Sequence, residues 1–153
     1  MKLPNCNSPA RRAARGFTLI ELMIVIGVVA ILTTIAVASY RTYVLRATRT
    51  EARMALLAIQ VAQEKFFLQN NQYAQTLATT IAAPPAGLGV ALDAAGVTTG
   101  GHYTVSYTAA TANTYTVRAV ATGTQTSDKA ACLTFTINDQ AVRTPADASG
   151  CWR

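Results

Sequence analysis

One apolar stretch limits what this chain can fold into more than any other part of the sequence. Residues 17–38 read FTLIELMIVIGVVAILTTIAVA and contain a single charged side chain, that of Glu21. A helix of this length spans roughly 33 Å, which is enough for the roughly 30 Å hydrocarbon layer of a bilayer. The stretch is longer than the apolar region of a typical secretory signal peptide, and no small-residue cleavage site follows it. We therefore expect it to remain in the protein as a membrane anchor.

The basic residues gather at the two ends of this stretch. The chain has 13 Lys and Arg residues against 7 Asp and Glu, which gives a net charge of +6. Four basic residues precede the stretch and four follow it within 15 residues, so the positive-inside rule does not give its orientation. From Met54 onward five basic residues balance five acidic ones, which excludes a basic globular domain. With one His and dispersed acids, we expect no metal site, no cofactor and no acid–base enzyme.

Glu21 is the residue that a simple membrane anchor does not explain. An ionised carboxylate at bilayer depth costs several kcal/mol unless it is paired. In the first interpretation Glu21 lies in the first helical turn near the interface, where the helix dipole stabilises it by roughly 0.3–1 kcal/mol. In the second, a cut after Gly16 gives Phe17 a free amine, and the carboxylate neutralises that amine or the amine of a neighbouring chain.

The residues around this position resemble a known processing signal. Arg15-Gly16-Phe17-Thr18-Leu19-Ile20-Glu21-Leu22 resembles the class III signal of type IV prepilins. The resemblance implies that a prepilin peptidase removes residues 1–16 by cutting between Gly16 and Phe17 on the cytoplasmic face, and then methylates the Phe17 amine. It also implies that Glu21 pairs with the N-terminus of a neighbouring pilin subunit during assembly. In similar pilins a proline often stands where this chain has Ala38, so proline-centred melting of the helix is not expected here.

The sequence predicts one long helix from Phe17 to about Asn71, because no Pro or Gly occurs between Val28 and Ala83. Its first half, 17–38, is apolar, and its second half, 39–72, is amphipathic. We expect one apolar face to pack on the rest of the protein and a weaker strip to remain exposed as a subunit contact. The alternative is a helix flanked by the domain on two sides. The expected packing face holds Tyr40, Tyr43, Ala47, Met54, Leu57, Ala58, Val61 and Leu68, and the weaker strip holds Leu45, Ala52, Leu56, Ile59 and Phe67.

Three arginines lie along one flank of this helix. Arg46, Arg49 and Arg53 are spaced i, i+3, i+7. They are interpreted as contacts to lipid phosphates, as partners of acids on adjacent subunits, or as a track for DNA phosphates. DNA is the weakest of these three interpretations, because no aromatic residue interleaves with the arginines and the chain from Met54 onward is neutral.

The second half of the chain predicts a small antiparallel sheet. Residues 73–101 form a connector rich in small residues, which the resemblance equates with the αβ loop of pilins. Apolar alternation in 102–108, 114–121 and 133–137 predicts three strands, and 141–143 a short fourth. The fold class is therefore α+β, with one long N-terminal helix packed on a three- to four-stranded antiparallel sheet, and the resemblance implies that this is a type IV pilin fold. His102 is expected to face solvent on its strand without a partner.

The cysteines are consistent with an exported protein. Of the three, Cys6 leaves with the leader, so Cys132 and Cys151 remain. A bridge between these two would stabilise the fold by roughly 3 kcal/mol and suits an oxidising periplasm. Two free thiols are the alternative. The resemblance implies that residues 102–153 comprise the sheet and a disulfide-bounded C-terminal loop.

The resemblance predicts a structural, non-enzymatic subunit of a type IV pilus. The ending Gly150-Cys151-Trp152-Arg153 is similar to that of PilE-like minor pilins of type IVa systems. The expected partners are other pilin subunits, the prepilin peptidase and the inner membrane, with nucleic acid only weakly supported. The chain would cross the inner membrane once, with its N-terminus cytoplasmic, and would then enter an extracellular pilus that serves adhesion, twitching motility or DNA uptake. The alternatives are a pseudopilin of type II secretion and a DNA-binding pilin.

Overall fold

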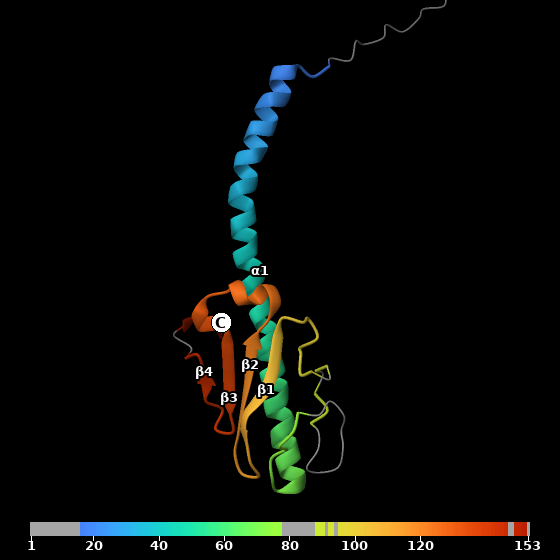
Figure 1. Cartoon of the computed structure of the whole chain (residues 1–153), viewed down its shortest axis with the longest axis vertical. Helices are drawn as coiled ribbons and strands as arrows, with labels where there is room; N and C mark the ends of the chain where they lie inside the picture. Colours follow the sequence, from blue (N-terminus) through green and yellow to red (C-terminus); the bar gives the residue numbers. More distant parts are fainter. Residues whose placement is uncertain (1–15, 78–87, 91, 94, 147–148, 153) are drawn as a thin grey trace, which may run out of the picture. The chain divides into compact units, whose positions relative to one another are not determined.

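The chain contains one long helix followed by a four-stranded sheet (Figure 1). The computed structural model describes residues 16–77, 88–90, 92–93, 95–146 and 149–152. The predicted leader up to residue 15, with Cys6, and residues 78–87 of the predicted αβ loop lie outside the described residues. The elements are α1 (Leu19–Asn70), β1 (Tyr103–Ala110), β2 (Tyr115–Ala121), η1 (Gly123–Ser127), η2 (Ala130–Cys132), β3 (Thr134–Asn138) and β4 (Arg143–Thr144).

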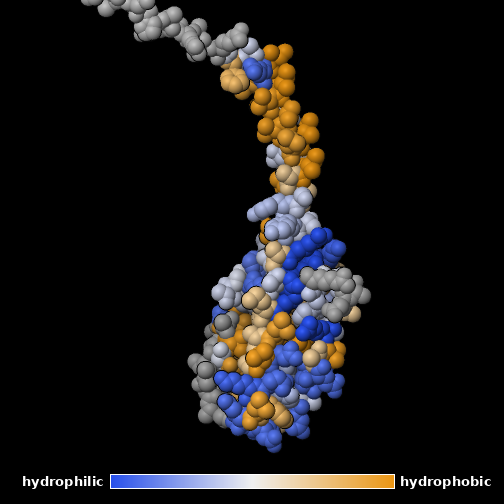
Figure 2. All heavy atoms as spheres, turned by 180° about the vertical axis from the view of Figure 1, so that it is seen from behind, coloured by the Kyte–Doolittle hydropathy of each residue, from blue (hydrophilic) through white to orange (hydrophobic). Residues whose placement is uncertain are grey.

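The structure divides into two compact units, Met1–Ala38 and Ser39–Arg153, and the second is called the body below. In the first unit, the part of α1 up to Ala38 is exposed throughout and, on the face that Figure 2 shows, presents an almost continuous hydrophobic surface. By length and composition, α1 could cross a membrane. Its hydroxyl groups are satisfied within the helix, since Thr33 Oγ1 donates to Val29 O at 2.7 Å and Thr34 Oγ1 to Ile31 O at 2.7 Å. Such internal bonds allow threonine to lie in an apolar environment.

The sheet of the body is antiparallel, and its spatial order β1-β2-β3-β4 follows the chain. Val117 of β2 pairs with Tyr107 of β1 and with Ile137 of β3, so apolar residues from neighbouring strands face the same side. The alternating burial of β2 matches the apolar alternation in the sequence. The prediction of a helix packed on a three- to four-stranded antiparallel sheet is confirmed.

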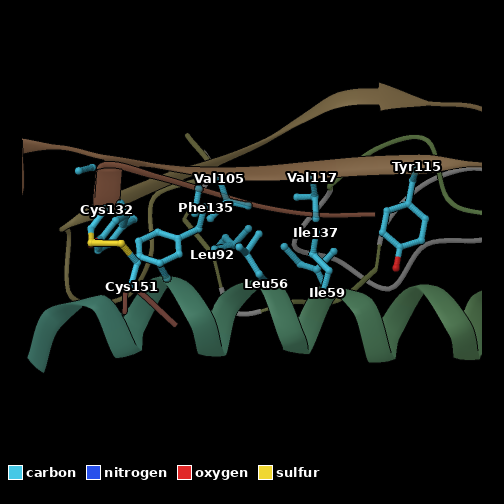
Figure 3. Close-up of a cluster of buried hydrophobic side chains, with 14 residues drawn as sticks. Leu56, Ile59, Leu92, Val105, Tyr115, Val117, Cys132, Phe135, Ile137 and Cys151 are labelled. Carbon is cyan, nitrogen blue, oxygen red and sulfur yellow. A yellow bond between two sulfur atoms is a disulfide. The ribbon is translucent and has the colours of Figure 1, made fainter. Parts of the chain in front are cut away.

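The face of α1 that packs on the sheet is the opposite of the predicted one. Leu56 and Ile59 are fully buried, and Figure 3 shows them pointing toward Val117, Ile137 and their neighbours in the sheet. The residues of the stronger predicted stripe are exposed instead: Met54 by 66%, Leu57 by 37%, Val61 by 70% and Leu68 by 86%. The buried residues of α1 are Arg49, Ala52, Leu56, Ile59, Gln63 and Phe66.

Two polar residues explain why counting apolar side chains selected the wrong face. Arg49 and Gln63 lie on the buried face and lower its apparent hydrophobicity, yet each has specific partners. The Gln63 amide donates from Nε2 to Ala74 O at 2.8 Å and accepts from Ala74 N at Oε1 at 2.9 Å, and it also contacts the Tyr107 hydroxyl. A buried amide with its partners in place avoids the cost of an unsatisfied polar group. It also holds the segment that leaves α1, which ends where Asn71 adopts a left-handed conformation with φ 53°.

We expect the two helix faces to respond differently to the same truncation. Leu56→Ala should lower the free energy of unfolding by about 2–5 kcal/mol, because it opens a cavity in the core. Leu68→Ala on the exposed face should change it by less than about 0.5 kcal/mol. Denaturant unfolding of the full chain in detergent, followed by circular dichroism, measures both. A larger loss for Leu68→Ala would contradict the observed packing face.

Candidate assembly and nucleic-acid sites

The start of α1 forms a capping box around Glu21. The backbone N–H of Glu21 donates to Thr18 Oγ1 at 3.3 Å, and the backbone N–H of Thr18 donates to Glu21 Oε2 at 3.5 Å. The Thr-x-x-Glu spacing produces this reciprocal pair, which satisfies two amides that a helix N-terminus leaves free. Glu21 therefore lies in the first turn, as the first interpretation of the sequence expected. Its pairing with an amine stays a prediction.

The predicted processing site is accessible in the structure. Phe17 is 83% exposed, and no atom lies within 4 Å of the position that a Cβ on Gly16 would occupy. Gly16, Phe17, Thr18 and Glu21 line one open pocket. The Gly16–Phe17 bond lies outside α1, which begins at Leu19.

A buried ion pair ties α1 to the loop after β2. Arg49 Nε lies 2.7 Å from Asp128 Oδ2, and Arg49 Nη2 lies 2.6 Å from Asp128 Oδ1. Only 6% of the Arg49 side chain and 3% of the Asp128 side chain are exposed. The other acceptor sites of Asp128 are used as well, by Gln125 Nε2 at 3.1 Å and by the Lys129 backbone N–H at 2.7 Å. Excellent geometry and additional hydrogen bonds of this kind are what a buried ion pair requires.

The same contacts shift the ionisation of both groups. The hydrogen bond to Asp128 raises the pKa of Arg49. Burial alone would raise the pKa of Asp128, but the hydrogen bonds from Arg49 and the Lys129 backbone outweigh it, so this pKa is lowered. A carboxylate with a lowered pKa stabilises the fold above the unfolded value of about 3.9, and the contribution is lost as the pH falls through the folded value.

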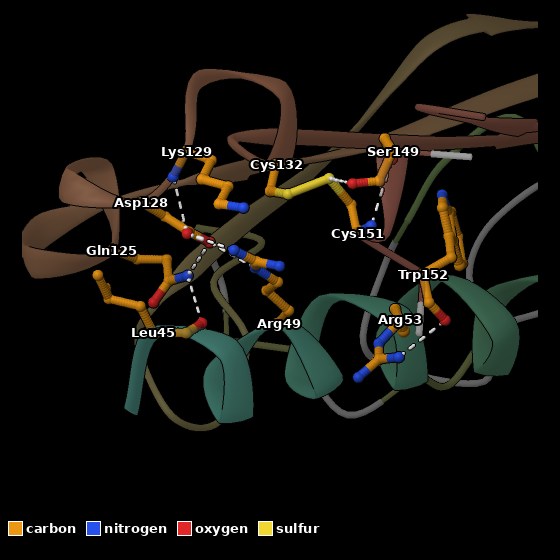
Figure 4. Close-up of a disulfide and its surroundings, with 10 residues drawn as sticks. All are labelled: Leu45, Arg49, Arg53, Gln125, Asp128, Lys129, Cys132, Ser149, Cys151 and Trp152. Carbon is orange, nitrogen blue, oxygen red and sulfur yellow. Dashed lines mark hydrogen bonds and ion pairs between the residues drawn. A yellow bond between two sulfur atoms is a disulfide. The ribbon is translucent and has the colours of Figure 1, made fainter. Parts of the chain in front are cut away.

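A second arginine holds the other end of the disulfide loop. Arg53 Nη1 donates to the backbone oxygen of Trp152 at 2.8 Å (Figure 4). Trp152 follows Cys151, whose disulfide to Cys132 confirms the predicted bridge. Both cysteines are fully buried. Arg49 and Arg53 therefore anchor the chain just before Cys132 and just after Cys151.

Two further basic residues lie around this disulfide. The guanidinium carbon of Arg143 is 5.3 Å from the centre of the Trp152 ring, a cation–π contact. Lys129 is exposed and immediately precedes η2, which carries Cys132. We call Arg53, Lys129, Arg143 and Trp152 the basic edge of the body.

The three arginines of the predicted flank have separate roles. Arg49 pairs with an acid of its own chain, so all three interpretations were wrong for it. Arg53 contacts the Trp152 carbonyl and, from Nη2, Thr50 Oγ1 at 2.6 Å. Arg46 is exposed, and the described residues offer it no hydrogen bond or ion pair. The aromatic residue missing from the DNA interpretation is Trp152, which the fold brings beside Arg53 from 99 residues away. No local sequence signal connects the two.

The prediction of an unpartnered, solvent-facing His102 was also wrong. His102 immediately precedes β1, and its Nδ1 lies 2.8 Å from Glu51 Oε2. Glu51 Oε1 accepts the Gly100 backbone N–H at 2.9 Å. Burial alone would raise the pKa of Glu51, but the hydrogen bonds from Thr98, His102 and Gly100 lower it. Glu51 therefore holds the segment before β1 against α1.

Comparison with known families gives two matches along the chain. A model described as "Type IV minor pilin ComP, DNA uptake sequence receptor" matches residues 38–136. A model described as "Prokaryotic N-terminal methylation motif" matches residues 11–37. The first match covers more than half of the chain, and the second covers the processing signal around Gly16 and Phe17.

Individual relatives match mainly over part of their length. The chain is 42% identical over 59 residues to the type IV major pilin protein PilA of Myxococcus xanthus, which is 39% of this chain and 27% of that protein. It is 35% identical over 75 residues to the type IV major pilin protein PilE1 of Neisseria gonorrhoeae, 48% of this chain and 46% of that one. The chain thus spans less than half the length of these curated relatives.

Two solved structures are similar in their organisation. A type IV pilin from Shewanella oneidensis gives a TM-score of 0.48 at 24% identity, covering 71% of this chain and 98% of that one. The non-core minor pilin PilV of Neisseria meningitidis gives a TM-score of 0.45 at 14% identity, covering 67% and 87%.

Removal of the buried arginine should be far more costly than removal of an exposed one. Arg49→Ala should lower the free energy of unfolding by about 3–5 kcal/mol, because it leaves the Asp128 carboxylate buried without its counter-ion. Arg46→Ala, one turn away on the exposed surface, should change it by less than about 0.5 kcal/mol. Urea unfolding of the full chain in detergent compares the two variants. Equal small effects would show that the ion pair does not hold the loop.

Proposed function

The chain belongs to the type IV minor pilin family that the ComP model describes, and on that premise we propose that it is a pilus subunit that binds DNA through its basic edge. The observation that carries the proposal is the group of basic residues beside the disulfide and Trp152. Arg143 lies on β4 at one margin of the sheet, and Arg53 and Lys129 lie beside the same disulfide. Basic residues gathered on one side attract DNA phosphates.

Two of the described acidic residues lie near β1. Glu51 contacts the segment just before β1, and Asp93 lies in the loop that bridges to β1, at the opposite margin of the sheet from Arg143. Asp128 is neutralised by Arg49. Asp139 lies in the turn between β3 and β4, where its backbone N–H donates to Tyr115 O at 3.2 Å. The positive charge of Arg53, Lys129 and Arg143 is therefore not offset by Asp128, the acid nearest to Lys129, because Arg49 already neutralises it.

We propose that the chain is processed at its N-terminal segment and assembles with other subunits through it. A prepilin peptidase would cut between Gly16 and Phe17 and methylate the Phe17 amine. Before assembly the apolar part of α1 would cross the inner membrane once with the leader in the cytoplasm, and afterwards the subunit would lie in an extracellular pilus. Thr18 and Glu21, which form the capping box, would both remain in the protein after the cut. Glu21 would then pair with the amine of a neighbouring subunit.

We expect Glu21→Ala to separate insertion from assembly. The variant should enter the membrane and lose its leader normally, because the apolar stretch and the Gly16–Phe17 bond are unchanged. Its recovery in sheared pili should fall at least about tenfold, since a buried amine would lack its partner. Intact mass of the membrane and pilus fractions measures processing, methylation and incorporation. Glu64→Ala, an exposed acid in the body, is the control. Normal incorporation of Glu21→Ala would contradict the pairing.

The affinity for DNA should fall with rising salt concentration, and more steeply the more basic residues contact phosphates. We expect the full chain in detergent to bind a fluorescent DNA duplex with a logarithmic salt slope that falls by about 1 when Lys129 is changed to Ala. Lys65→Ala, at the far end of α1, should leave the slope unchanged. Fluorescence anisotropy at several salt concentrations measures both. The absence of salt-dependent binding by the unmodified protein would overturn the DNA function.

A further inference from the structure

We propose that Arg143 reads guanine in the major groove of the bound duplex and that Trp152 holds the Arg143 guanidinium in place for this contact. The inference rests on the proposed DNA-binding function. It assigns sequence recognition to one residue of the basic edge and leaves phosphate contacts to the others.

Arg143 is placed where a groove could receive it. It begins β4, a two-residue strand at the margin of the sheet, and its backbone is held by pairing with Ile137 of β3. No other described strand lies beyond β4. The side chain of Arg143 can therefore approach DNA from the free edge of the sheet. Arg143 itself is exposed.

The Trp152 ring under Arg143 is firmly anchored. It packs edge-to-face on Phe135, with ring centres 5.5 Å apart and planes at 83°. Phe135 is fully buried, so this contact joins Trp152 to the core. The preceding residue, Cys151, is held by the disulfide, and the Trp152 backbone oxygen accepts from Arg53. A ring restrained in these ways can orient the cation that lies over it.

The cation–π contact with Trp152 leaves the donors of Arg143 available. A guanidinium that lies over an aromatic ring uses its face, whereas its N–H groups point outward in its plane. In the described part of the chain no acceptor binds the Arg143 guanidinium. Guanine presents O6 and N7 in the major groove, and a bidentate arginine is the commonest specific partner of this pair. An arginine that is already oriented loses less side-chain entropy when it binds.

Two buried hydrogen-bond donors near Arg143 have no acceptor among the described residues. Trp152 Nε1 and Arg53 Nε are both buried, and neither has a hydrogen-bond partner among the described residues. The exposed donors of the basic edge are those of Arg143 and Lys129, and they suit a ligand whose contacting atoms are acceptors, such as phosphate oxygens and the edge of guanine. Lys129 differs from Arg143, because a flexible ammonium group acts as a point charge and suits a phosphate.

The experiment first finds a preferred duplex and then removes single interactions. The full chain in detergent is used to select duplexes from a pool of random sequence, and the enriched duplex is competed against a scrambled one. We expect a motif that contains guanine. Arg143→Lys keeps the positive charge but loses the two parallel N–H donors of the guanidinium. It should therefore reduce the preference for the selected duplex by roughly 5- to 150-fold and leave the dependence of affinity on salt concentration unchanged. Lys129→Ala should weaken both duplexes equally.

A modified base tests the atom that is read. Replacing the motif guanine by 7-deazaguanine removes N7, and we expect this to weaken binding by the unmodified protein but not by Arg143→Lys. Trp152→Phe retains an aromatic ring and should give a smaller loss of preference than Arg143→Lys. Circular dichroism and unfolding midpoints equal to those of the unmodified protein show that the variants are folded.

The outcomes separate this inference from the proposed function. Binding without sequence preference, or full preference in Arg143→Lys, would overturn guanine reading while DNA binding stands. Equal competition by single-stranded DNA would overturn reading in the major groove. If no duplex is retained at any salt concentration, the proposed DNA function is overturned and this inference with it.

Discussion

The buried pair of Arg49 and Asp128 is the interaction on which the architecture of the body depends. Two charges removed from water cost several kcal/mol each, and only complete pairing offsets this cost. The Asp128 carboxylate accepts hydrogen bonds from two nitrogens of Arg49, from the Gln125 amide and from the Lys129 backbone N–H, so both of its oxygens have hydrogen-bond donors. The pair specifies where the segment between β2 and β3 meets α1, and Cys132 follows four residues later. The position of the disulfide, of Trp152 and of the basic edge therefore follows from this contact.

The two faces of α1 in the body serve different purposes. The buried face combines small and aliphatic residues with Arg49 and Gln63. The hydrogen bonds of these two polar side chains form only when α1 lies in one position relative to the segments that it contacts. The opposite face leaves Met54, Val61 and Leu68 largely exposed. An exposed apolar stripe of this kind is typical of a surface that meets another chain. A subunit that assembles through its helix requires such a division, because the helix face used inside the subunit is not available to a neighbour.

The basic edge shows how function can depend on an arrangement that composition conceals. From Met54 onward five basic residues balance five acidic ones, yet Lys129 and Arg143 lie near the disulfide whereas Asp93 lies beside β1, at the other margin of the sheet. Internal neutralisation contributes to this, since Arg49 removes the charge of Asp128 from the side where Lys129 is exposed. The contact between Arg143 and Trp152 then joins β4 to the C-terminal segment after the disulfide. The long-range field of the edge favours polyanions in general, whereas specificity requires an oriented group.

The sequence by itself determined the features that depend on neighbours along the chain. The apolar stretch, the signal around Gly16, the Thr18–Glu21 spacing, the helix, the alternating strands and the cysteine pair are all local patterns or simple counts. Tertiary structure alone decided which face of α1 is buried, that Arg49 pairs with Asp128, that His102 meets Glu51, and that Trp152 lies beside Arg53. The physical reason is that a buried polar side chain is stable only with partners supplied from distant segments. Hydropathy along the chain records the polarity of such a residue but not the partners that permit its burial.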